Sequence, residues 1–257
     1  MSAWLDPLRR VLDTASAPLT FFFRDDDAGW EDERLLTLID RFASRGVALD
    51  VAAIPAAVGP PLACVLRELT DGTPRIVAVH QHGYAHVNHE REGRKCEFGP
   101  SRPIDAQRRD LEDGRTRLED LLGGSVARVF TPPWNRCTPA TAACLADLGF
   151  SILSRDVGAA PLGDHGLVEH PVAVDWCGRR GARRGCAGLG MSIAAAAVVG
   201  SPVGIMLHHA VMTPEDFSLV GELLTVISSH PSARATELSS LPTAPVGDGR
   251  DEHAWPA

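Results

Sequence analysis

The sequence predicts a single α/β domain built as an irregular barrel of parallel strands. Short apolar runs alternate with longer segments of helical period, which is typical of strands connected through helices into a parallel sheet. Seven of these runs are candidate strands, and that number of parallel strands favours a closed barrel. The glycine-rich nucleotide loop of an open doubly wound sheet is absent from the sequence, which disfavours that alternative.

The individual elements follow from apolar spacing and from capping residues. Residues 31–44 carry an apolar stripe at helical spacing, and residues 104–122 form a polar-faced helix rich in Arg and Asp. A helix over residues 138–147 begins with Thr138-Pro139, and a last helix begins with Thr213-Pro214, because threonine caps a helix and proline suits its first turn. We expect the strands at residues 19–24, 48–54, 75–80, 127–131, 151–154, 166–174 and 203–207.

Length and charge limit the organisation and the partners. With 257 residues and 44% hydrophobic content, the chain can bury one large core, and we expect residues 1–240 to form one domain. Residues 241–257 combine Pro, Gly and acidic residues without an apolar period, which predicts a loosely ordered tail. A formal charge of -8 argues against a nucleic-acid partner.

The sequence also predicts a cytoplasmic protein without a membrane span. Residues 1–18 contain charges and lack the long apolar core of a secretory signal. Residues 187–207 are uncharged and about as long as a spanning helix, but Gly200-Ser201-Pro202 would break that helix. We therefore expect an alanine-rich helix followed by a buried strand. The six cysteines include no CxxC pair, which predicts free thiols rather than structural zinc.

Three carboxylates follow the first strand, at a position where a barrel carries its chemistry. Asp25-Asp26-Asp27 follow Phe21-Phe22-Phe23-Arg24, and neighbouring carboxylates repel one another unless a cation or protons neutralise them. A bound metal is the simplest explanation. An acidic turn before the helix at residue 31 is the structural alternative.

Four histidines lie within ten residues at the end of the third strand, between His80 and His89. His82 and His86 are four residues apart, so both imidazoles can bind one metal from a helical turn. His80 and His82 would share one face of a strand and form a competing pair. A carboxylate with two imidazoles leaves positions open for water and substrate, which indicates a catalytic site and fits zinc best among divalent metals.

Three other segments could contribute to a site. His208-His209 end the last strand and could supply a general acid, or could be a surface pair before the helix at Thr213. The turn after Thr131 presents Trp134 and could form one wall of a pocket. The arginines of residues 179–184 could bind a phosphate, although an exposed loop would look the same.

These residues together resemble the polysaccharide deacetylases of carbohydrate esterase family 4, which include enzymes similar to chitooligosaccharide deacetylases. Five motifs occur in the family order over most of the chain: Asp26-Asp27-Ala28-Gly29, His82-Gly83-Tyr84-Ala85-His86, Phe130-Thr131-Pro132-Pro133-Trp134-Asn135, Asp175-Trp176 and Met206-Leu207-His208-His209. The resemblance implies a distorted (β/α)7 barrel with parallel strands.

The resemblance also implies a role for each matching residue. Asp26 would be the general base, and Asp27, His82 and His86 would hold a divalent metal. Asp175 would orient the catalytic histidine, which is His208 or His209. The walls of the substrate groove would be Pro133, Trp134, Asn135 and Trp176.

The sequence departs from the family pattern at several positions. Thr131 stands where the third motif normally has an arginine that pairs with the base, and Arg24 or Arg136 could replace it. A shift of one residue in the first motif would make Asp25 the base and Asp26 a ligand, although the spacing to Gly29 favours Asp26. Asp156 competes with Asp175 for the fourth motif.

The function expected from the sequence is metal-dependent hydrolysis of an acyl amide. The substrate would be a sugar or related small molecule, and acetyl is the acyl group that the family suggests. One alternative is a member that binds metal and carbohydrate without catalysis, which the replacement of the usual arginine by Thr131 keeps open. Another is a hydrolase of a non-sugar amide. The oligomeric state is not predicted.

Overall fold

The strands of the described chain form one parallel sheet that curls into a distorted barrel. The computed structural model describes residues 2–73, 75–178 and 185–242. The strands are β1 (Leu19–Ala28), β2 (Leu49–Ala53), β3 (Val77–His82), β4 (Val126–Thr131), β5 (Ile152–Leu153), β6 (Val168–Glu169), β7 (Val172–Asp175), β8 (Val203–Leu207) and β9 (Ala233–Ala235). The helices are α1 (Asp6–Thr14), α2 (Asp32–Ala43), α3 (Pro60–Thr70), α4 (Ile104–Leu122), α5 (Pro139–Asp147), α6 (Cys186–Val199) and α7 (Pro214–Ser229).

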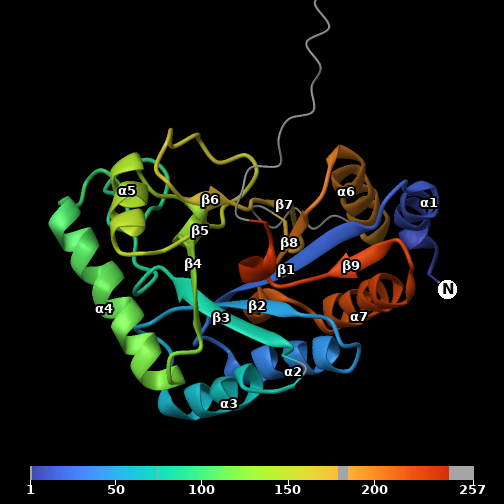
Figure 1. Cartoon of the computed structure of the whole chain (residues 1–257), viewed down its shortest axis with the longest axis horizontal. Helices are drawn as coiled ribbons and strands as arrows, with labels where there is room; N and C mark the ends of the chain where they lie inside the picture. Colours follow the sequence, from blue (N-terminus) through green and yellow to red (C-terminus); the bar gives the residue numbers. More distant parts are fainter. Residues whose placement is uncertain (1, 74, 179–184, 243–257) are drawn as a thin grey trace, which may run out of the picture.

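The strand order brings the expected functional segments to one rim. The order is β6-β5-β4-β3-β2-β1-β8-β7, and β9 pairs with the start of β1. The helices lie around the outside of the sheet, with α2, α3 and α4 following one another along it (Figure 1). Parallel strands place their carboxyl ends together, so the segments after β1, β3, β4 and β8 can converge. The prediction of a distorted parallel barrel is confirmed.

One segment accounts for much of the distortion. We predict a single strand at residues 166–174, and the structure divides it into β6 and β7. β6 pairs with β5 whereas β7 pairs with β8, so the two strands lie on opposite edges of the sheet. Pro171 separates them, and a proline cannot donate a hydrogen bond to a strand ladder.

Alternation along β1 sorts its side chains between the two faces of the sheet. Phe21 and Phe23 pack in the large core between the sheet and the helices, whereas Phe22 packs in a cluster inside the barrel. Successive side chains of a strand point to opposite faces. Arg24 and Asp26 therefore share the interior face with Phe22, and Asp25 shares the outer face with Phe21 and Phe23.

The helices agree closely with their sequence signals. α4 has the predicted bounds, and both Thr138 and Thr213 form capping boxes at the starts of α5 and α7. The uncharged stretch of residues 187–207 divides as predicted into α6 and β8, separated by residues 200–202. Among the described helices, none combines the length and apolar character needed to cross a membrane.

Three elements lie outside the predictions. Helices α1 and α3 and the short strand β9 occupy segments for which we predict no element. Leu241, the first residue of the predicted tail, is buried with the cluster inside the barrel. The rest of that tail, residues 243–257, lies outside the described residues.

Candidate active site

Three ligand atoms converge at the carboxyl ends of β1 and β3. Asp27 Oδ1 lies 3.1 Å from His82 Nε2 and 3.2 Å from His86 Nε2. All three donor atoms lie within 4.8 Å of one another. Asp27 and His86 both have positive backbone φ angles, of 74° and 56°, which non-glycine residues rarely adopt. Strained backbone of this kind is concentrated at functional sites.

The donor chemistry of this group fits a divalent metal. His82 Nδ1 donates to the Thr131 carbonyl oxygen at 3.0 Å, which points Nε2 at Asp27. Burial raises the pKa of Asp27, but its hydrogen bond to His82 and the surrounding imidazole charges outweigh burial and hold that pKa well below its usual range. An ionised carboxylate and two imidazole nitrogens form a ligand set suited to zinc.

His80 does not belong to this group. Its side chain is fully buried, and its Nε2 lies 2.8 Å from Thr131 Oγ1. Burial and the nearby Arg24 charge lower the pKa of His80 to about 3, so the imidazole is neutral. The competing pair of His80 and His82 is therefore not brought together around one metal position.

Asp26 is paired with an arginine from its own strand. Arg24 Nε and Nη2 donate to the two oxygens of Asp26 at 2.8 and 2.9 Å. Further acceptors, at 2.8–2.9 Å, are the carbonyl and hydroxyl oxygens of Ser154 and the side-chain oxygen of Asn135. Burial raises the pKa of Asp26, but the charges of Arg24, His82 and His208 outweigh it and hold that pKa below its usual value.

This pairing separates the two candidate arginines. Arg24 has no exposed surface and contacts the carboxylate directly. Arg136 instead donates to the Lys95 carbonyl oxygen at 2.7 Å. Of the two replacements considered for the arginine missing at Thr131, the structure brings Arg24 to Asp26.

Asp25 and His209 form a separate buried pair on the outer face of the sheet. His209 Nδ1 lies 2.6 Å from Asp25 Oδ2, and its Nε2 lies 2.6 Å from the Trp30 carbonyl oxygen. Both partners are acceptors, so both ring nitrogens carry protons. Burial lowers the pKa of His209, but the charge and hydrogen bond of Asp25 outweigh it and raise that pKa to about 9. His209 is completely buried, which makes it unsuitable as an acid that reaches substrate.

His208 faces a cavity instead. Its Nε2 lies 3.9 Å from Asp26 Oδ2. The cavity has a volume of about 720 Å³, and Asp156 and Asp175 both line it, so the structure brings both candidates for the fourth motif close to the site. Asp175 Oδ1 accepts from the Gly178 backbone N–H at 3.1 Å. The other lining residues are Arg94, Trp134, Asn135, Arg136, Gly178 and Met206.

Only two of the four residues expected to form the groove walls line the cavity at the site. The Trp134 ring lies 4.4 Å from the His86 ring and lines the cavity with Asn135. Pro133 is buried beside Gly83. Trp176 is buried in the core, where its ring makes an edge contact with Trp4 at 6.2 Å. Trp176 belongs to the large core cluster and is not among the residues that line the His208 cavity.

Sequence reasoning missed two residues that shape the site. Trp30 is 40% exposed, and its ring lies 4.9 Å from the His86 ring. Its position directly after Gly29 of the first motif was a possible signal. Glu97 is fully buried and accepts the backbone N–H groups of Tyr84 and Ala85 at 3.2 and 2.8 Å. Nothing in the local sequence connects Glu97 to the histidine loop that it holds.

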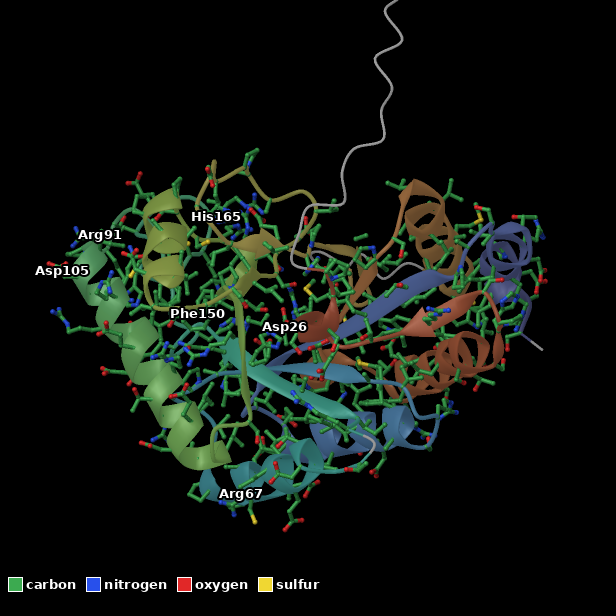
Figure 2. The ribbon with its side chains drawn as sticks, viewed as in Figure 1. Asp26, Arg67, Arg91, Asp105, Phe150 and His165 are labelled. Atoms are coloured by element: carbon green, nitrogen blue, oxygen red, sulfur yellow. The ribbon has the colours of Figure 1, made fainter. Side chains whose placement is uncertain are left out.

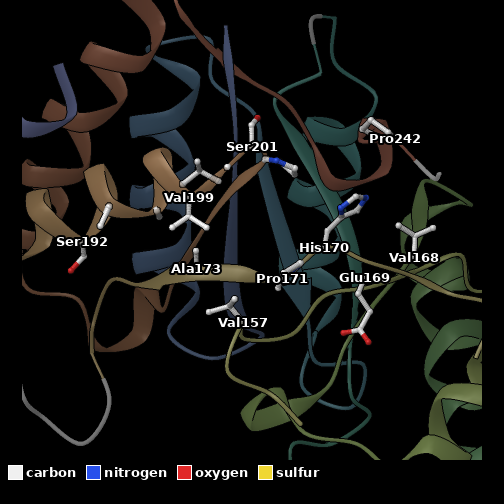
Figure 3. A pocket seen from close by; sticks show the side chains of 15 residues that line it. Val157, Val168, Glu169, His170, Pro171, Ala173, Ser192, Val199, Ser201 and Pro242 are labelled. Carbon is white, nitrogen blue, oxygen red and sulfur yellow. The ribbon is translucent and has the colours of Figure 1, made fainter. Parts of the chain in front are cut away.

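The candidate site lies at the centre of the fold. Figure 2 shows Asp26 inward of the helices that carry Arg67 and Asp105. A second cavity, of about 640 Å³, lies at the amino ends of β7 and β8, next to α6 (Figure 3). Its lining is mainly apolar and includes Val157 and Val199, with Glu169 and His170 on one side. The arginines of residues 179–184, for which phosphate binding and an exposed loop were the alternatives, lie outside the described residues.

Comparison with known proteins finds solved structures with a similar fold. No protein-family model and no curated protein sequence matches the chain. A polysaccharide deacetylase from Mycobacterium smegmatis, described as putative, superimposes with a TM-score of 0.63 at 17% identity, covering 88% of this chain and 92% of that one. A family 4 acetyl xylan esterase from Clostridium thermocellum, in complex with a cobalt ion, superimposes with a TM-score of 0.53 at 14% identity. The match covers 86% of this chain and 88% of that one.

A family member without activity is also similar. A family 4 pseudoenzyme from Bacillus anthracis gives a TM-score of 0.57 at 11% identity, covering 87% of this chain and 65% of that chain. Identities this low establish a shared fold, and the fold occurs in both active and inactive proteins. The chain has the fold of the family 4 carbohydrate esterases and polysaccharide deacetylases, the family that its motifs resemble.

Proposed function

We propose that this protein is a metal-dependent hydrolase that removes an acyl group, such as acetyl, from an amide nitrogen of a sugar or related small molecule. One observation carries the proposal. Asp26 is ion-paired with buried Arg24, adjoins the ligand Asp27 in the chain, and lies 3.9 Å from His208, which lines the cavity. A base, a metal ligand and an acid are thereby available at one position.

The ligands proposed for the metal are Asp27, His82 and His86, and the donor set favours zinc. When bound, a divalent metal polarises the acyl oxygen and makes a bound water more acidic. The carboxylate of Asp26, kept ionised by Arg24, accepts the proton of the attacking water. Arg24 also fixes the orientation of that carboxylate through two parallel hydrogen bonds.

The opposite side of the cavity serves the leaving group. His208 donates a proton to the departing nitrogen, a role that its exposure to the cavity supports. Asp175 lines the same cavity and is proposed to orient His208 as the family motif implies. Trp134 and Asn135 line the side of the cavity nearest the ligands, where they would contact the substrate.

The non-catalytic alternative depends on the missing third-motif arginine. Arg24 makes the contact that this arginine would make, although it comes from β1 rather than from the segment after β4. That pairing favours the catalytic proposal. The similarity to a pseudoenzyme shows why the fold alone cannot decide between the two functions.

Acetate release separates these possibilities. Metal-stripped protein should be assayed with N-acetylglucosamine, with chitooligosaccharides and with a non-sugar N-acetyl amide, before and after zinc is added. We expect zinc-dependent acetate release from at least one of the sugars. If the protein binds zinc and releases no acetate from any of these compounds, the hydrolase proposal is wrong. Release from the non-sugar amide alone would reject the sugar substrate and keep the reaction.

A further inference from the structure

The two imidazoles of the proposed ligand set are held in different ways. His82 donates its Nδ1 proton to the Thr131 carbonyl oxygen, so one hydrogen bond fixes both its tautomer and its ring orientation. His86 lies in the loop after β3, at a backbone φ of 56°. The His86 ring lies 3.2 Å from Asp27, which is itself a proposed ligand.

Two ring contacts restrain the His86 imidazole, beside a hydrogen bond to its own backbone. The Trp134 ring lies 4.4 Å from the His86 ring at an interplanar angle of 58°, and the Trp30 ring lies 4.9 Å away at 68°. Tilted and edge-on arrangements at these separations are favourable for aromatic rings. Trp30 and Trp134 come from loops after different strands, so the imidazole is restrained by both segments.

Trp30 is itself held by the buried pair that the catalytic proposal does not use. Its carbonyl oxygen accepts from His209 Nε2 at 2.6 Å, and His209 is fixed by Asp25 through both its ring and its backbone N–H. The Trp30 backbone N–H donates to the Asp27 carbonyl oxygen at 3.1 Å. The turn between Asp27 and Trp30 is therefore fixed at both ends, and it delivers the indole to His86.

We infer that Trp30 is a positioning residue for metal binding: its indole, with that of Trp134, orients His86 as a ligand, and the Asp25–His209 pair holds Trp30 in place. This inference rests on the proposed function, since it needs a metal at Asp27, His82 and His86. It also gives Asp25 and His209 a purpose outside the reaction itself.

If this inference holds, the metal affinity of the site depends on the exposed side chain of Trp30. Trp30 is 40% exposed and lies outside the buried core, so its removal should leave folding nearly intact. Without the Trp30 indole, the His86 ring loses one of its two indole contacts and is less ordered before the metal binds, which weakens binding. Mutation of a residue that orients a metal ligand typically lowers the metal affinity by about 10-fold or more.

The test measures the zinc dissociation constant of metal-stripped protein by competition with a chromogenic chelator. Trp30→Ala should weaken zinc binding about 10-fold, and Trp30→Phe should restore most of the affinity because a ring is again present. Ile104→Ala is a matched control, because Ile104 is 41% exposed and lies at the start of α4. His209→Asn should also weaken zinc binding, and if it fails to fold, the Trp30 variants still decide.

A second readout distinguishes positioning from substrate contact. The visible absorption spectrum of bound cobalt reports ligand geometry and should change in Trp30→Ala but not in Ile104→Ala. Wild-type zinc affinity and an unchanged cobalt spectrum in Trp30→Ala, with only KM raised, would overturn the inference and make Trp30 a substrate wall. Asp27→Ala tests the proposed function separately. Zinc affinity retained in Asp27→Ala would reject the ligand set, whereas loss there with no effect of Trp30→Ala rejects only this inference.

Discussion

The guanidinium of Arg24 is enclosed inside the barrel, where an unpaired charge would be strongly unfavourable. Its donors instead meet the carboxylate of Asp26, two oxygens of Ser154 and the side-chain oxygen of Asn135. These partners come from β1 and from the segments after β4 and β5. Arg24 thus ties together three parts of the barrel while it keeps Asp26 ionised.

Replacing Arg24 should separate turnover from metal binding. In Arg24→Gln, Asp26 loses its charged partner and its fixed orientation, so turnover should fall about 100-fold, within the range typical of a general base. Zinc affinity should remain close to wild type because Arg24 contacts none of the proposed ligands. Arg24→Lys keeps the charge without the two parallel hydrogen bonds and should be intermediate. Unchanged turnover in Arg24→Gln would show that the pair does not support catalysis.

At this scale the sequence points to the residues that meet at the candidate site but not to all of their roles. Its spacing to Gly29 favours Asp26 over Asp25, and it leaves His208 and His209 as alternatives. The structure separates each pair by the alternation of a strand, with Asp25 and His209 together on one face and Asp26 and His208 on the other. The sequence cannot choose the faces, because Phe21, Phe22 and Phe23 are all apolar and give no sign of which one points inward.

Among the elements, the end of β1 and the segment after β8 are joined by the Asp25–His209 pair. The folded-state pKa of His209 is about 9, above its ordinary value of 6.5. A raised pKa means that the proton-linked stabilisation is complete below about pH 6.5 and is lost as the pH rises through 9. The unfolding free energy should therefore fall between about pH 6.5 and 9 as His209 loses its proton.

This pH dependence can be measured by denaturant unfolding of wild type and His209→Gln at pH 6, 8 and 9.5. The difference in unfolding free energy should be largest at pH 6, smaller at pH 8 and smallest at pH 9.5. His230→Gln replaces a partly exposed histidine beside Asp13 and controls for the change of residue type. A His209 difference that stayed constant across this range would show that the pair is not an ion pair.

The loop after β3 depends on a glycine that the ligand motif does not explain. Gly83 has a backbone φ of 58°, and a Cβ there would overlap the Glu97 carboxylate and the Pro133 ring. Gly83→Ala should lower the unfolding free energy by about 1–3 kcal/mol and weaken zinc binding, because the loop carries His86 and begins directly after His82. Chemical unfolding and chelator competition measure the two effects.

The same loop offers a matched control for Gly83. Gly93 has a φ of 78°, but a Cβ there would meet nothing within 4 Å. Gly93→Ala therefore carries the conformational penalty without the overlap. If the two alanine variants lost equal stability and bound zinc equally, the contact with Glu97 and Pro133 would have no part in holding the loop.

At the scale of the whole molecule, the alternation of apolar runs and helical periods was sufficient to predict a distorted parallel barrel. The details of closure were not predictable, because β6 and β7 lie in one apolar stretch and pair with strands on opposite edges. The convergence of strand ends predicted that acidic and histidine segments would meet. Trp30 and Glu97 escaped prediction because their contacts depend on loops whose paths the residue pattern does not specify.

The division of roles between neighbouring aspartates is the central claim, and Asp26→Asn measured beside Asp27→Ala tests it most directly. Zinc content after dialysis and acetate release should both be determined for each variant. Asp26→Asn should keep the wild-type zinc content and lose turnover about 1,000-fold, whereas Asp27→Ala should lose zinc and activity together. Loss of zinc in Asp26→Asn, or turnover retained without that carboxylate, would contradict the account.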